Sequence, residues 1–139
     1  MERYTDSQTW YCVFDKAYGL KKWWQRFLHK DFQHVHLIRD NRDYCLMVNS
    51  MQHVMAVREY PNTLEDILAQ EIEQSPSAIL MMTVHYGSHY KHMPLEPLTC
   101  VTVAKRLLGI NARAVQTPRS LYCEMLKAGA TVIKGFTPA

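Results

Sequence analysis

The sequence lacks the long apolar segments and the charge clusters that mark membrane and nucleic-acid-binding proteins. None of its apolar runs approaches the ~20 residues of a membrane span. The first residues, MERYTDSQTW, contain no apolar core of a signal peptide. The net charge of +3 comes from scattered Lys and Arg, whereas a nucleic-acid surface needs basic residues clustered on one face. We therefore expect no membrane span, no signal peptide and no nucleic-acid partner.

The sequence also lacks the cysteine spacings of metal-binding and redox motifs. Its four cysteines lie far apart, and neither CxxC nor HExxH occurs. This excludes a zinc ribbon, a thioredoxin-type motif and a metalloprotease helix as predictions from pattern. Free thiols are typical of a reducing compartment, so we expect a cytoplasmic protein without a cofactor. The cysteines are Cys12, Cys45, Cys100 and Cys123.

One histidine cluster offers a metal site as an alternative. His85, His89 and His92 have the spacing H-x3-H-x2-H, which on one helix face could bind zinc with Cys100 as a fourth ligand. Gly87 and the polar, loop-like composition argue against a helix there. Histidines in such a loop more often line a cleft or the surface, so we predict no metal site.

Composition and periodicity predict a single α+β domain over residues 1–139. Hydrophobic residues make up 47% and charged residues 21% of the chain, which is typical of an ordered globular protein. We expect a central antiparallel sheet packed against the helix that carries Cys100 and flanked by the other helices. Strands are predicted at Trp10–Phe14, Phe32–Arg39, Tyr44–Ser50, His53–Tyr60 and Ala78–Val84, with an edge strand near 131–136, and helices at Tyr18–Leu28, Thr63–Ser75, from Thr99 to Gly109, and from Pro118 to Gly129.

The segment from Phe32 to Ser50 predicts an antiparallel hairpin. Its turn is either the two residues Asn41 and Arg42 or the four from Asp40 to Asp43, and in both cases opposed residue numbers sum to 83 in a symmetric hairpin. This register places His34 directly opposite Asn49, with Cβ atoms ~5 Å apart.

Cys100 stands where a helix should begin. Pro97 prevents the preceding turn from being helical, Thr99 is a typical N-cap, and the apolar positions then follow helical spacing to Gly109. Free N–H groups and the helix dipole stabilise a thiolate in the first helical turn. Cys100 is therefore the candidate nucleophile, although a buried structural cysteine would fit the same position.

Cys100, His34 and Asn49 supply the three residue types of a cysteine hydrolase. The imidazole would take the thiol proton, and the amide would orient the ring without a charge that competes with it. The Cys100 N–H would be one oxyanion donor, and the second is not identified. His36 is the rival base, but its predicted partner, Met47, cannot orient a ring. His53 would serve only if the strands bring it beneath Cys100.

The order of these segments resembles a known family. A histidine-bearing strand, FQHVHLI, a following strand with a polar residue, and a late cysteine at a helix start, LTCVTVAKRLLGI, are similar to the circularly permuted branch of the papain-like NlpC/P60 superfamily. That branch includes lecithin:retinol acyltransferase-like proteins and small bacterial and phage proteins. The resemblance covers roughly residues 32–126. The segment TPRSLYCEML resembles small phage-encoded members, whereas the Asn-Cys-x-His-Phe signature of the acyltransferase-like group is absent.

The resemblance implies a Cys–His hydrolase or transferase that acts on an amide, ester or thioester. Cys100 would be the nucleophile, His34 the base and Asn49 the orienting residue. The leading hypothesis is a peptidase-like or amidase-like hydrolase. The alternative is a non-catalytic protein of papain-like fold, such as a phage particle component that contacts phage or host proteins and resides in the virion.

Overall fold

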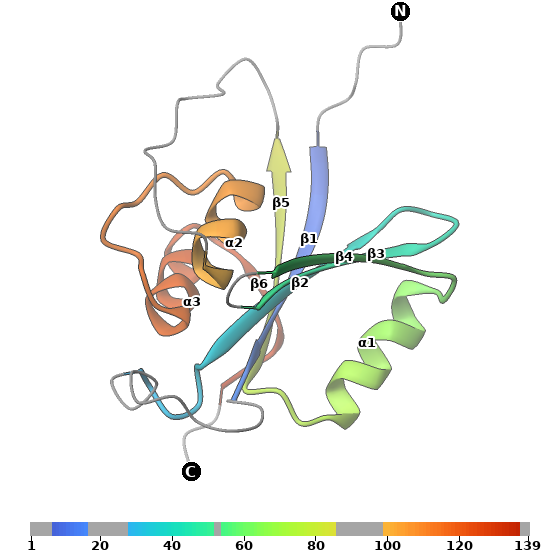
Figure 1. Cartoon of the computed structure of the whole chain (residues 1–139), viewed down its shortest axis with the longest axis horizontal. Coiled ribbons are helices and arrows are strands. Elements are labelled where there is room, and N and C mark those ends of the chain that lie inside the picture. The colour runs from blue at the N-terminus through green and yellow to red at the C-terminus, as the bar shows by residue number, and fades with distance from the viewer. Residues whose placement is uncertain (1–6, 17–27, 52–53, 86–98, 137–139) are drawn as a thin grey trace, which may run out of the picture.

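A six-stranded antiparallel sheet and three helices make up the secondary structure of the residues that the computed structural model describes, 7–16, 28–51, 54–85 and 99–136. The strands lie in the order β4-β3-β2-β1-β5-β6, with β1 and β2 at the centre (Figure 1). This confirms the α+β class and the central antiparallel sheet. The strands are β1 Ser7–Asp15, β2 His34–Asp40, β3 Cys45–Met51, β4 Val54–Tyr60, β5 Ala78–His85 and β6 Thr131–Lys134; the helices are α1 Leu64–Glu73, α2 Cys100–Leu108 and α3 Pro118–Lys127.

Helices cover both faces of the sheet. Figure 1 shows α2 and α3 on one face and α1 on the other. Alternate strand residues point to opposite faces, so β1 sends Phe14 into the core beneath α2 and α3 and Val13 into a smaller core with Ile67 of α1. The Cys100 helix therefore packs on the sheet as predicted, whereas the predicted helix at Tyr18–Leu28 lies, except for Leu28, outside the described residues.

The β2–β3 hairpin has a different register from the predicted one. The paired residues run from Leu37↔Val48 to Asp40↔Cys45, so their numbers sum to 85 rather than 83. The loop is 41–44, one residue later than the predicted four-residue loop. The Asp40 carboxylate accepts the Arg42 N–H at 3.1 Å, and Arg42 adopts a positive φ of 63°. Asp40 thus ends the strand and begins the turn by capping it, which shifts the register.

Each helix begins at a threonine cap. Thr63, Thr99 and Thr117 precede α1, α2 and α3, and each side-chain oxygen accepts a backbone N–H three residues later. Gly109 ends α2 with a φ of 68°, a left-handed conformation that glycine adopts without strain. The predicted starts of α2 and α3 are therefore confirmed.

Candidate active site

Cys100 is the first residue of α2, and a reciprocal cap holds its backbone in place. The Thr102 N–H donates to Thr99 Oγ1 at 3.1 Å, and the Thr99 N–H donates to Thr102 Oγ1 at 2.7 Å. The two bonds satisfy N–H groups that would otherwise lack partners at the helix start. The helix start that the sequence predicted around Cys100 is thus present.

The Cys100 side chain is partly buried and packs against the core beneath α2 and α3. Burial raises the pKa of its thiol, although backbone hydrogen bonds from Val35, from Val101 and from its own N–H act to lower it. The helix start therefore provides the expected N–H groups, but desolvation outweighs them. At neutral pH the resting thiol is protonated.

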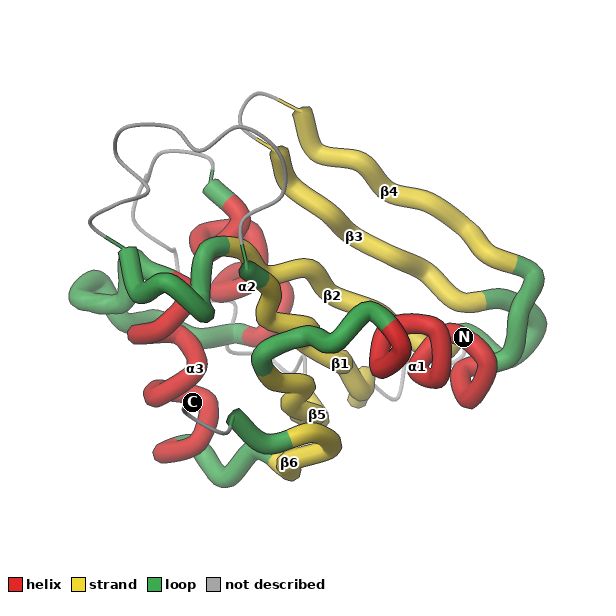
Figure 2. Tube along the Cα trace, turned by 90° about the horizontal axis from the view of Figure 1, so that it is seen from below, coloured by secondary structure: helices red, strands yellow, loops and turns green. Residues whose placement is uncertain are grey.

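The contact with Val35 places the thiol where the sheet opens. The β2–β3 ladder stops at Leu37↔Val48, whereas β2 remains paired with β1 as far as His34. Strand β3 likewise remains paired with β4 to its last residue, Met51. Figure 2 shows β3 and β4 diverging from β2 toward the side on which α2 lies. The sulfur of Cys100 thus meets the backbone of the residue next to His34 beyond the end of the β2–β3 ladder.

His34 and Asn49 contact each other beyond the end of the β2–β3 ladder, on the face of the sheet that α1 covers, whereas Cys100 packs on the opposite face. His34 Nε2 lies 2.7 Å from Asn49 Oδ1. The predicted contact is therefore present, but in the observed register it is diagonal rather than directly opposed. Because an amide oxygen only accepts, Nε2 must carry the proton, and the lone pair of the neutral ring is on Nδ1. Asn49 thereby fixes the tautomer in which Nδ1 is the basic atom.

The protonation state of His34 suits a base. Burial lowers its pKa, and the hydrogen bond with Asn49 opposes this effect without reversing it. The imidazole is therefore uncharged at neutral pH and can accept a proton.

His36, the rival base, is fully occupied by carboxylates. Its Nε2 lies 3.1 Å from Glu71 Oε1 and its Nδ1 lies 3.2 Å from Asp15 Oδ2, the latter an ion pair without the alignment of a hydrogen bond. Burial acts to lower the pKa of His36, but the two carboxylates outweigh it and raise the pKa to about 9. His36 is therefore an imidazolium at neutral pH and cannot accept a proton.

Neither carboxylate was predicted from the sequence, and the partner predicted for His36 was wrong. Met47 pairs with Ile38, not with His36. Glu71 lies one helical turn after Ile67, on the buried side of α1, where an acidic residue was a detectable signal of a buried partner. Asp15 is the last residue of the apolar strand β1.

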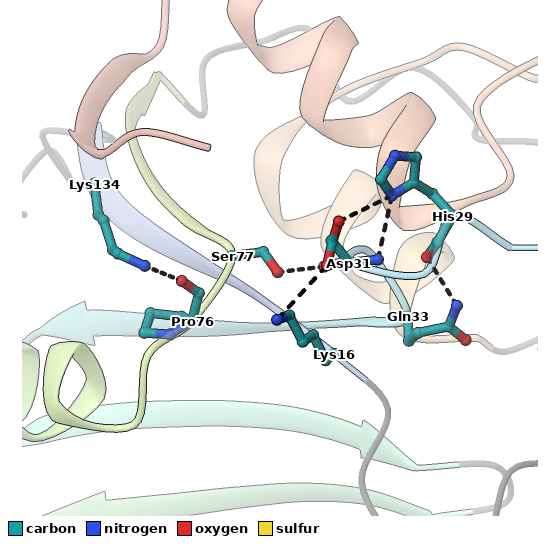
Figure 3. A network of polar contacts seen from close by, with 7 residues as sticks. All are labelled: Lys16, His29, Asp31, Gln33, Pro76, Ser77 and Lys134. Carbon is teal, nitrogen blue, oxygen red and sulfur yellow. Dashed lines mark hydrogen bonds and ion pairs between the residues drawn. The ribbon is translucent and has the colours of Figure 1, made fainter. Parts of the chain in front are cut away.

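A polar network fixes the turn that leads into His34 (Figure 3). The Gln33 side-chain amide donates to the His29 carbonyl at 2.8 Å, and the Asp31 N–H donates to His29 Nδ1 at 3.2 Å. The hydroxyl of Ser77, the residue before β5, donates to the Asp31 carbonyl. Lys16, which follows β1, lies 3.7 Å from the Asp31 carboxylate. The turn is thus connected to the end of β1 and to the start of β5, which positions the first residue of β2.

The remaining candidates lie either in elements other than α2 or outside the described residues. His53 lies outside the described residues, as do His89 and His92 of the considered metal cluster, and His85 is exposed at the end of β5. Cys12 and Cys45 are buried in strands, and Cys123 is partly buried within α3. In the part of the chain that the structure describes, no group of three His, Cys, Asp or Glu residues is arranged to hold a metal ion.

None of the described helices is long and apolar enough to cross a membrane. Comparisons of the chain with protein-family models, with curated proteins and with solved structures found no match.

Proposed function

We propose that the protein is a cysteine-dependent hydrolase of the permuted papain-like kind, acting on an amide or ester. Cys100 is its nucleophile, His34 its base and Asn49 its orienting residue. Two contacts carry the proposal: the 2.7 Å hydrogen bond that fixes the His34 tautomer, and the contact of the Cys100 thiol with the backbone of Val35, the next residue of β2. Both contacts involve adjacent residues of β2, which supports the proposal that they belong to one site. His34 shares the α1 face of the sheet with His36, whereas Cys100 packs on the α2 face, so the reaction requires the two side chains to meet past the end of the β2–β3 ladder.

The resting charges define how such a site would react. A protonated thiol and an uncharged imidazole mean that the proton passes to His34 Nδ1 as the sulfur attacks the carbonyl carbon. The Cys100 N–H at the helix start stabilises the resulting oxyanion. The imidazolium then protonates the leaving amine or alcohol, which leaves a thioester on Cys100. Water attacks the thioester carbon and gives a proton to His34. The bond between carbon and sulfur then breaks, the carboxylic acid leaves, and His34 returns the proton to the sulfur.

Alkylation by iodoacetamide tests the proposal, with modified sites located by mass spectrometry. Cys100 should react faster than Cys123 at neutral pH, because the proposal gives Cys100 the base His34, whereas Cys123 is a similarly exposed thiol within α3. His34→Gln should remove the advantage of Cys100, and Cys100→Ala should remove its label while leaving the fold intact. Equal labelling of both cysteines, or an unchanged rate in the His34 variant, would contradict the assignment.

A second candidate function is a non-catalytic interaction protein with the same fold, such as a component of a phage particle. The observation that favours it is the raised pKa of the buried Cys100 thiol. In this case the alkylation rate of Cys100 is that of an ordinary buried thiol with a raised pKa, and it is independent of His34. The same series of variants therefore separates the two functions.

A further inference from the structure

Three buried charged side chains lie beside His34 and have no role in the proposed reaction. Asp15, His36 and Glu71 are 2%, 7% and 8% exposed, and they come from β1, β2 and α1. His36 lies between the two carboxylates, at 3.2 Å from Asp15 and 3.1 Å from Glu71. The rings of His34 and His36 are stacked with centroids 6.2 Å apart. The cluster therefore faces the same side of β2 as the proposed base.

The carboxylate of Asp15 would favour the protonated form of His34. Asp15 is the direct partner of His34 in the β1–β2 register. A buried carboxylate opposite an imidazole favours the imidazolium, which cannot accept a proton. Here the carboxylate lies against His36 instead. Burial lowers the pKa of His34, and the hydrogen bond with Asn49 raises it. Two smaller effects also oppose each other, because His36 lowers this pKa and Asp15 raises it.

We propose that His36 is a positioning residue for the active site: as an imidazolium held by Glu71, it binds and neutralises Asp15, and so leaves His34 an uncharged base. This inference rests on the proposed function only in giving His34 the role of base. The charge arrangement itself is independent of it. The groups that face the cluster are Asp15 from β1, His34 from β2, Glu71 from α1 and the neutral Asn49 from β3.

The test is an NMR titration of the His34 ring in the full chain, paired with the pH profile of Cys100 alkylation by iodoacetamide. In His36→Gln, Asp15 loses its cationic partner, so the pKa of His34 should rise by about one unit or more. The alkylation profile should move to higher pH by the same amount. The double variant Asp15→Asn with His36→Gln should return both to their original positions, because it removes the carboxylate that His36 neutralises. Structural damage alone would add up in the double variant rather than reverse.

Two single variants keep the test informative if His36→Gln does not fold. Asp15→Asn leaves His36 paired with Glu71 and should lower the pKa of His34. Glu71→Gln leaves the Asp15–His36 contact in place but removes one of the two carboxylates that hold the His36 proton, so the pKa of His34 should rise less than in His36→Gln.

An unchanged His34 titration in both His36→Gln and Asp15→Asn would overturn the inference, and so would a double variant that stays shifted. Failure of the proposed function is seen separately. In that case Cys100 alkylation is independent of His34 in every variant, while the NMR shifts still occur as described.

Discussion

Two histidines of one strand, two residues apart, have different charges because their partners differ: His34 is neutral and His36 is cationic at neutral pH. His34 meets the neutral amide of Asn49, and burial then lowers its pKa. His36 meets two carboxylates, which overcome burial and raise its pKa to about 9. Pairs of titratable groups that their surroundings push apart are a recurrent property of catalytic sites. The choice between the two residues as base is therefore decided by their neighbours.

Asn49→Asp tests this dependence on a neutral partner. A carboxylate of nearly the same shape should favour the imidazolium, so the pKa of His34 rises by about one unit or more. Cys100 alkylation at neutral pH should then slow, because the base is already protonated. Asn111→Asp, an exposed position after α2, adds the same charge elsewhere and should change neither quantity. An identical His34 titration in the Asn49 variant would show that the 2.7 Å contact does not persist in solution.

The contact between His34 and Asn49 was predictable from the sequence only in part. Alternation placed both residues on one face of a hairpin, and that inference holds. The register depended on the turn, where the Asp40 side chain and the left-handed Arg42 move the loop by one residue. A side chain as long as histidine still reaches the diagonal position, so the pairing survives a wrong register.

At the scale of elements, helix starts were the most predictable feature because their signals are local. Thr99 and Thr117 each form a reciprocal cap with the residue three positions later, Thr102 or Ser120. Such bonds need no information from the rest of the fold. The end of the β2–β3 ladder at Leu37 and Val48 was not predictable, because it depends on tertiary packing rather than on local sequence.

The two matched caps separate the stability of a helix from the reactivity of Cys100. Thr99→Ala and Thr117→Ala should each lower the free energy of unfolding by about 1 kcal/mol, measured by urea denaturation. Only Thr99→Ala should alter the alkylation rate of Cys100, because it frays the turn whose N–H groups contact the thiol. Equal effects of the two substitutions on the alkylation rate would mean that the helix start does not influence the cysteine.

At the scale of the whole molecule, the sheet separates two cores. The cluster of Asp15, His36 and Glu71 joins the two central strands of the sheet, β1 and β2, to α1. The hydrogen bond between His36 and Glu71 links residues 35 positions apart, and the ion pair between His36 and Asp15 crosses from β2 to β1. Periodicity indicates that α1 has a buried side, but it does not indicate which face of the sheet receives it. For this reason the sequence predicted the class of fold and the sheet, but not the ionic contacts that hold α1.

These contacts make the stability of the whole fold depend on pH. His36 has a pKa of about 9 when folded and about 6.5 in the unfolded chain, so between these values the folded state retains a proton that the unfolded state releases. Its contribution is complete below pH 6.5 and is lost as the pH rises through 9. The shift corresponds to a loss on the order of 3 kcal/mol in the free energy of unfolding.

Urea denaturation between pH 6.5 and 9 measures this loss, and Glu71→Gln is the matched comparison. Without the Glu71 carboxylate the folded pKa of His36 should fall, so the variant's free energy of unfolding should change less over the same interval. The buried thiols have raised pKa values and add their own dependence at the alkaline end, but they are the same in both proteins and cancel in the difference. If the free energies of unfolding of the two proteins change in parallel with pH, Glu71 does not hold the His36 proton. The proposed ionic link between α1 and the sheet would then be wrong.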